Sequence, residues 1–162
     1  AGKNLEALYA AYFDVQKALA SDKKPPPDSS QALHKAALEL RSDAALPAAS
    51  AKLAQAIAAK SEHLHHLDLN GARKEFKPIS HAIVTLASQV RSEGAQNSFT
   101  HFYCPMVKDG GGDWLQPGGE LLNPYFGSEM LRCGDKVQEF PPQGKTSNRS
   151  PAASESQGRA AQ

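Results

Sequence analysis

Cysteine and methionine are confined to one segment of the chain. The sulfur-containing residues are Cys104, Met106, Met130 and Cys133. Thiolates and thioethers are the soft ligands that select Cu(I) and related soft ions. Cys and Met two residues apart project to the same side of an extended segment, and Met and Cys three residues apart converge on one side of a helical turn. If the two pairs meet, they form a site suited to Cu(I) or Ag(I) rather than to zinc, which favours Cys and His in four-coordinate sites.

The same side chains allow other chemistry, and the sequence leaves these alternatives open. A disulfide between Cys104 and Cys133 would staple an irregular segment to the rest of the protein, with the methionines as core residues. The chain would then be a protein-interaction module without a metal. His101, three residues before Cys104, is a further candidate metal ligand or a group that orients one. A thiol redox protein with Cys104 as its nucleophile is a third interpretation.

Composition argues against several classes of function. The 18 Lys and Arg residues nearly cancel the 17 Asp and Glu residues, for a formal net charge of +1, which argues against a nucleic-acid-binding protein. No apolar run approaches the roughly 20 residues of a membrane-spanning helix. The glycines at 110–112 lack the lysine and helix of a phosphate-binding loop, and no nucleophile elbow occurs. We therefore expect a protein that is not an enzyme.

Alanine- and leucine-rich segments with helical periodicity occupy the first part of the chain, up to residue 92. Apolar side chains recur at steps of three and four, most regularly between Leu69 and Val90, as on the buried face of a helix. Asp68 is a suitable N-cap for that helix, and Pro78 should kink it. The expected helices span residues 4–20, 29–41, 48–64 and 69–92. Four amphipathic helices joined by short loops predict an antiparallel four-helix bundle.

The segment 99–140 has little periodicity and is rich in Gly, Pro and aromatic residues. We expect it to form an irregular Cys/Met flap on the bundle, anchored by Trp114, Tyr125 and Phe126. The expected short strands cover 99–103, 130–133 and 136–140, and the expected turns cover 109–113 and 116–119. A single, mainly α-helical domain is therefore predicted over residues 1–140. Its bundle covers 4–92, and a disordered tail follows over 141–162.

Short motifs in both parts of the chain carry a resemblance to a known family. In the flap they are Tyr103-Cys104-Pro105-Met106, Trp114-Leu115, Asn123-Pro124-Tyr125-Phe126-Gly127 and Met130-Leu131-x-Cys133-Gly134. In the helices they are Tyr12-Phe13 and Ala72-Arg73-x-x-Phe76-x-x-x-Ser80. Together they resemble a bacterial exported domain of unknown function, which also occurs as the C-terminal extension of copper/silver efflux adaptors, the membrane fusion proteins of heavy-metal efflux pumps.

The resemblance implies an exported or periplasmic domain associated with heavy-metal handling, without implying a known reaction. It also implies partners among efflux pumps or other periplasmic metal-handling proteins. Arg73, at a family position, is expected to hydrogen-bond carbonyl groups of the flap, and Ser80 to satisfy a carbonyl group freed by the Pro78 kink. The flap residues expected to have a structural role are Trp114, Asn123, Pro124, Tyr125 and Gly127.

Overall fold

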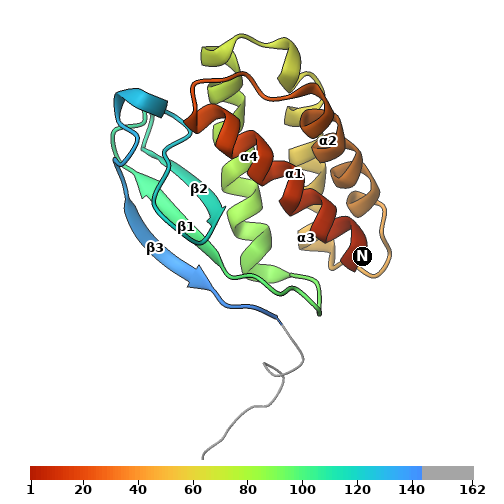
Figure 1. Cartoon of the computed structure of the whole chain (residues 1–162). Helices are drawn as coiled ribbons and strands as arrows, with labels where there is room; N and C mark the ends of the chain where they lie inside the picture. Colours follow the sequence, from red (N-terminus) through yellow and green to blue (C-terminus); the bar gives the residue numbers. More distant parts are fainter. Residues whose placement is uncertain (144–162) are drawn as a thin grey trace, which may run out of the picture.

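The computed structural model describes residues 1–143, in which helices and a three-stranded antiparallel sheet pack together (Figure 1). The helices are α1 (Gly2–Ala20), α2 (Pro27–Arg41), α3 (Ala48–Ser61) and α4 (Leu69–Gln89). The strands are β1 (Phe99–Cys104), β2 (Gly112–Pro117) and β3 (Asp135–Phe140). Two short 3-10 helices are η1 (Leu64–His66) and η2 (Gly127–Glu129). Except for its first three residues, the tail predicted to be disordered over 141–162 lies outside the described residues.

The predicted fold class, a four-helix bundle with an irregular flap, is wrong. The chain combines its helices with an antiparallel sheet in the order β2-β1-β3, so the fold is mixed α and β. Consecutive helices pack side by side, and β2 lies mainly against α4 and also against α1 (Figure 1). In a closed four-helix bundle, α1 would pack along α4. Here the sheet packs against both helices on that side instead.

The observed fold differs from the predicted one largely because of strand β2. Its sequence, Gly112–Pro117, has the glycine and proline that are typical of turns. In the structure it pairs with β1 along its whole length, from Gly112 opposite Cys104 to Pro117 opposite Phe99. Pro117 is tolerated because it ends an edge strand. The strand expected at 130–133 does not form, since these residues make a turn after η2.

Local signals predict the helices well and some of their ends poorly. Asp68 caps α4 as expected, because its carboxylate accepts the Gly71 N–H group at 2.7 Å. Helix α2 begins at Pro27, before the expected start at Ser29, since proline suits the first helical turn. Helix α4 contains Pro78 and ends at Gln89. Within residues 1–143, no helix has both the length and the apolar character needed to cross a membrane.

Aromatic side chains connect the helices to the sheet. Tyr12 of α1 stacks on Phe76 of α4, with ring centroids 5.0 Å apart. Phe76 contacts Tyr125 at 5.9 Å, and Tyr125 packs edge-on against Trp114 of β2 at 6.1 Å. All four side chains are buried. The series runs from the first helix to the sheet, and it includes two of the aromatic residues expected to anchor the C-terminal segment.

The hydroxyl group of Tyr12 joins three elements in the core. It shares a 2.6 Å hydrogen bond with Ser80 Oγ of α4 and accepts the Leu115 N–H group of β2 at 3.2 Å. Ser80 therefore bonds a side chain, not the helix carbonyl group that we expected it to satisfy. Because β2 is an edge strand, the Leu115 N–H group would otherwise be left unpaired. Burial raises the pKa of Tyr12 well above its ordinary value, which keeps the hydroxyl group protonated.

Changing Tyr12 to phenylalanine should destabilise the protein by about 1–3 kcal/mol, because it leaves the Ser80 hydroxyl and Leu115 N–H groups buried without their partner. Ser88→Ala is the control, since Ser88 Oγ donates to the Thr85 carbonyl group on the exposed side of the same helix. The control should change stability by less than about 0.5 kcal/mol. Urea denaturation measures both variants, and equal effects would contradict the role assigned to Tyr12.

Candidate functional site

Two thiol groups from distant parts of the sequence meet at the end of β1. Cys104 is the last residue of β1, Cys133 lies in the turn before β3, and their Sγ atoms are 3.2 Å apart. Both cysteines are free thiols. Cys104 is fully buried and Cys133 is partly buried, so Cys133 is the more accessible of the pair. The two segments that we expected to converge therefore meet at their cysteines.

Asn123 sets the position of Cys133. Its buried side-chain amide donates to the Cys133 carbonyl group at 2.8 Å, and its side-chain oxygen accepts the N–H groups of Tyr125 and Phe126. The backbone N–H group of Asn123 also donates to the Leu131 carbonyl group at 2.8 Å. These bonds close residues 123–133 into a compact loop whose far end returns to β1.

Arg73 of α4 joins this loop to the helices. Its guanidinium group donates to the Pro124 carbonyl group at 2.8 Å and to the Leu19 carbonyl group at 2.7 Å. It also pairs with the Asp22 carboxylate at 2.9 Å. The bond to Pro124 confirms the prediction that Arg73 holds a carbonyl group of the C-terminal segment. The end of α1, the N-terminal part of α4 and the loop are thereby linked through one side chain.

Gly127 must be a glycine because the chain passes directly over this ion pair. Its φ is +56°, and a Cβ atom there would lie 1.9 Å from Asp22 Oδ1 and 2.5 Å from Arg73 Nη2. The next residue, Ser128, donates its N–H group to the Asp22 carboxylate. Hydrogen bonds from Ser128 and Arg73 hold the pKa of Asp22 below its usual range. The ion pair is therefore part of the support for the loop that carries Cys133.

The two methionines differ in how exposed their side chains are. Met106 lies in the turn after β1 and is 60 % exposed. Met130 follows η2 and is partly buried. A methionine side chain has three rotatable bonds and adapts to its surroundings. Met106, two residues from Cys104, is therefore the thioether with more freedom to approach a bound ion.

His101 lies on the opposite face of β1 from Cys104. Side chains alternate along a strand, so residues three positions apart point to opposite faces. The His101 ring instead contacts Asp113 of β2, with 3.1 Å between Nε2 and Oδ1. The structure therefore places His101 beside Asp113 and does not bring it to the thiol pair.

The contact between the thiols changes the acidity of Cys133. The hydrogen bond with Cys104, and then burial, raise the pKa of Cys133 above its ordinary value. The thiolate is the form that binds metals and attacks electrophiles. At neutral pH Cys133 is therefore held as a thiol, and a metal ion that binds the pair has to displace its proton.

The thiol pair suits an ion that needs few protein ligands. Among residues 1–143, no cluster of three or more His, Cys, Asp or Glu side chains could hold a metal ion. This part of the chain thus offers no preformed four-coordinate Cys/His site of the kind that structural zinc favours. Two thiolates fit the soft-donor preference of Cu(I) and Ag(I), and the Met106 thioether lies two residues beyond Cys104 in the sequence.

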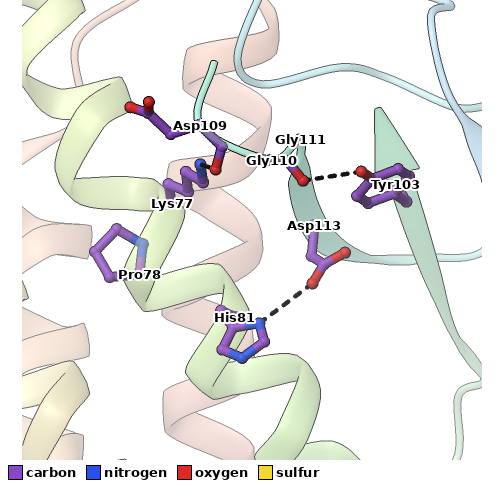
Figure 2. Close-up of a pocket in the computed structure, with 8 residues that line it drawn as sticks. All are labelled: Lys77, Pro78, His81, Tyr103, Asp109, Gly110, Gly111 and Asp113. Carbon is purple, nitrogen blue, oxygen red and sulfur yellow. Dashed lines mark hydrogen bonds and ion pairs between the residues drawn. The ribbon is translucent and has the colours of Figure 1, made fainter. Parts of the chain in front are cut away.

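A second group of polar residues was not singled out by the sequence. Lys77 and His81 of α4 face Tyr103 of β1 and Asp113 of β2 across a cleft (Figure 2). His81 and Asp113 are 32 residues apart, and His81 alone resembles any polar residue on a helix. Only the pairing of the strands and their packing on α4 bring these side chains together, so no local signal could have found them.

No protein-family profile, curated protein or solved structure matches the chain. The resemblance to the domain of copper/silver efflux adaptors therefore depends on the short motifs within residues 4–140.

Cys104→Ala should accelerate alkylation of Cys133 at neutral pH, because loss of the thiol hydrogen bond lets the pKa of Cys133 fall toward its ordinary value. The measurement is the rate of iodoacetamide labelling at Cys133 as a function of pH, and its midpoint should move to lower pH. In the companion variant Cys133→Ala, the fully buried Cys104 should react much more slowly. An unchanged midpoint in Cys104→Ala would show that the thiol contact does not control the acidity of Cys133.

Proposed function

We propose that this protein binds a monovalent soft metal ion, Cu(I) or Ag(I), through Cys104 and Cys133. The observation that carries the proposal is the 3.2 Å separation of two Sγ atoms whose residues are 29 positions apart in sequence. Thiolates select such ions over the hard cations that prefer oxygen ligands. In this function the ion is cargo, which the protein carries or buffers without a chemical reaction.

Binding requires a small opening of the thiol pair. Metal–thiolate bonds are about 2.3 Å long for zinc, so two sulfurs that share an ion of similar size lie about 4 Å apart or more. Relative to the present 3.2 Å, the two Sγ atoms must separate by about 1 Å. Cys104 is held in the β1–β2 ladder opposite Gly112, so the movement falls on Cys133 and its turn.

Met106 is the side chain best suited to add a third ligand. It is exposed and lies two residues beyond Cys104, so its thioether can move without disturbing the core. Met130 is partly buried after η2, and a change of its rotamer would also disturb its neighbours. We therefore assign the thioether role first to Met106 and second to Met130.

An exported or periplasmic location and transfer of the ion to a partner are part of the same proposal. The support is the resemblance of the flap motifs to the domain of copper/silver efflux adaptors. The partner would be an efflux pump or another periplasmic metal-handling protein. A formal net charge of +1 provides no strong attraction to nucleic acid, which favours a protein partner.

A disulfide-stapled interaction module is the second candidate, and one observation favours it. The 3.2 Å between the Sγ atoms is shorter than the separation that a shared metal ion requires. Formation of a disulfide needs the two sulfurs to approach to about 2.05 Å, a movement of similar size in the opposite direction. The bond would tie β1 to the loop that Asn123 organises.

Titration of the reduced protein with Cu(I) against bicinchoninate should show one ion bound per chain. Changing either cysteine to serine should weaken binding by at least about 100-fold, and Met106→Leu should weaken it by about tenfold, because each removes a soft ligand. Val137→Leu is the matched control, since Val137 is an exposed apolar residue of β3, and its affinity should be unchanged.

The same titration separates the two candidates. Affinity that survives the loss of either cysteine contradicts the metal site. Reduced protein that binds no Cu(I), together with a complete disulfide in protein purified without reductant, selects the interaction module.

The affinity for Cu(I) should rise with pH, because each thiol proton that the ion displaces contributes up to about tenfold per pH unit below the pKa of that thiol. Since the pKa of Cys133 is raised, the rise should continue above the ordinary range of a cysteine. Conditional affinities measured across a pH series give the slope. Cys133→Ser should reduce the slope by one proton, whereas an unchanged slope would indicate that Cys133 does not ligate the ion.

A further inference from the structure

Gly134 connects Cys133, the more accessible thiol of the pair, to strand β3. It follows Cys133 directly and precedes Asp135, the first residue of the strand. Its φ is +143°, a backbone conformation that residues with a side chain rarely adopt. The turn that carries Cys133 therefore needs a glycine for its backbone conformation alone.

Three atoms also crowd the place where a Cβ atom of residue 134 would lie. They are Cη2 of Trp114 at 3.1 Å, the carbonyl oxygen of Tyr103 at 3.1 Å and Cδ1 of Leu121 at 3.2 Å. All three distances are shorter than an ordinary van der Waals contact, which begins at 3.4 Å. Trp114 belongs to β2 and Tyr103 to β1. The missing side chain thus lets the turn lie directly against both strands.

Hydrogen bonds keep Trp114 from moving aside to admit a Cβ atom. Its side chain is fully buried, and its indole N–H group donates to Gln116 Oε1 at 2.9 Å. The same oxygen accepts the Leu122 N–H group at 3.0 Å, and the Gln116 side-chain amide donates to the Glu120 carbonyl group at 2.8 Å. A shift of the indole ring would therefore cost a buried hydrogen bond and disturb the loop that Gln116 holds.

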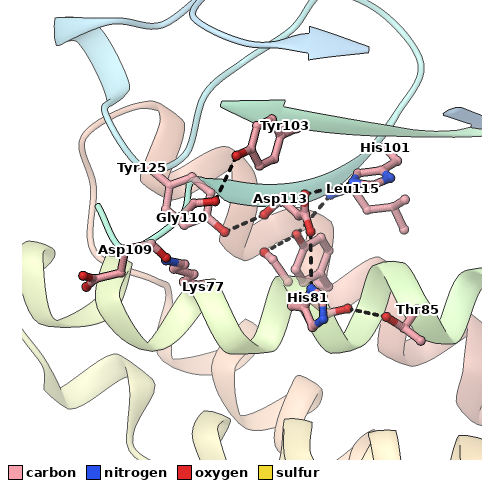
Figure 3. A network of polar contacts seen from close by, with 12 residues as sticks. Lys77, His81, Thr85, His101, Tyr103, Asp109, Gly110, Asp113, Leu115 and Tyr125 are labelled. Atoms are coloured by element: carbon pink, nitrogen blue, oxygen red, sulfur yellow. Dashed lines mark hydrogen bonds and ion pairs between the residues drawn. The ribbon is translucent and has the colours of Figure 1, made fainter. Parts of the chain in front are cut away.

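The Tyr103 carbonyl group is fixed as well. Tyr103 lies in the central strand of the sheet, opposite Asp113 of β2 and Asp135 of β3. Its hydroxyl group donates to the Gly110 carbonyl group at 2.9 Å (Figure 3). Among the three neighbours of the missing Cβ atom, only Leu121 is a partly buried aliphatic side chain that could change its rotamer. An added side chain would therefore push the turn away from the strands.

Hydrogen bonds on both sides of Cys133 hold its backbone in this turn. The Cys133 N–H group donates to the Met130 carbonyl group at 3.0 Å, and the Cys133 carbonyl group accepts the Asn123 amide at 2.8 Å. Cys104 is fully buried at the end of β1 and cannot follow a movement of the turn. A displacement of the turn from β1 would therefore widen the 3.2 Å between the two Sγ atoms.

We propose that Gly134 positions the Cys133 thiol against Cys104, and that a side chain at this position would separate the pair. The inference deepens the proposed metal site, and its meaning for metal binding rests on that proposal. Gly134 supplies no ligand. It acts by letting the turn lie against Trp114 and the Tyr103 carbonyl group, so that both thiols can face one ion.

The effective concentration of the two thiols toward each other reports their spacing without any metal. In a metal-free glutathione buffer, the two protein thiols form one disulfide bond while glutathione disulfide is reduced to two molecules of glutathione. The ratio of oxidised to reduced protein at equilibrium gives the effective concentration. Gly134→Ala should lower it by at least about tenfold, because a misplacement of about 1 Å between reacting groups can cost about 100-fold.

Gly119→Ala is the matched control. Gly119 also has a positive φ, of +86°, but a Cβ atom there would meet nothing within 4 Å. This variant therefore has a comparable backbone conflict in the C-terminal segment without the contacts to Trp114 and Tyr103, and its effective concentration should equal that of the unchanged protein. An undiminished value in Gly134→Ala, or an equal fall in both variants, would overturn the proposal.

Leu121→Ala provides a second comparison in case Gly134→Ala does not fold, as judged by circular dichroism. It removes the Cδ1 contact, so the double variant Leu121→Ala/Gly134→Ala has more room for the added methyl group. Trp114 and the Tyr103 carbonyl group still oppose that group, so the double variant should remain at least about threefold below Leu121→Ala in effective concentration. Equal values would contradict the proposal. Because no metal takes part, these results are independent of whether the protein binds Cu(I).

Discussion

The guanidinium group of Arg73 is the contact on which the position of the thiol pair depends. It binds a carbonyl group at the end of α1 and one at the start of the loop that leads to Cys133, and its side chain is only 14 % exposed. A planar cation with five N–H donors can hold several chain segments at fixed angles, which a lysine ammonium group on a flexible stem does not do. Asn123 then closes the loop that Arg73 anchors, and Cys133 reaches Cys104 as a result.

Local interactions explain why the helices could be predicted from the sequence while the sheet could not. The apolar spacing between Leu69 and Val90 and the cap at Asp68 act over a few residues, so each is visible in a short window of sequence. Strand β2 is stabilised by pairing with β1 and by the hydroxyl group of Tyr12. Tyr12 is 103 positions away in the sequence from Leu115, the β2 residue whose N–H group it accepts. From the sequence alone, the glycine and proline at the ends of β2 indicate turns, because its distant partners are not visible in the local sequence.

The candidate site also has one part that could be predicted from the sequence and another part that depends on distant contacts. The convergence of Cys104 and Cys133 could be anticipated because all sulfur side chains fall in one segment. The contact of His101 could not be predicted, because its partner Asp113 belongs to the strand that the sequence did not reveal. The cleft between Lys77 and His81 of α4 and Tyr103 and Asp113 of the strands combines three elements, so it became visible only with the register of the sheet.

The exposure of Met106 has a consequence for damage by oxidants. Its thioether is 60 % exposed, whereas Cys104 is fully buried and Cys133 is held as a protonated thiol. Peroxide would therefore reach this methionine first and convert it to the sulfoxide, whose added oxygen makes the side chain polar. A sulfoxide is a harder donor than a thioether, so such a lesion would weaken the proposed binding of soft ions, and methionine sulfoxide reductases would reverse it.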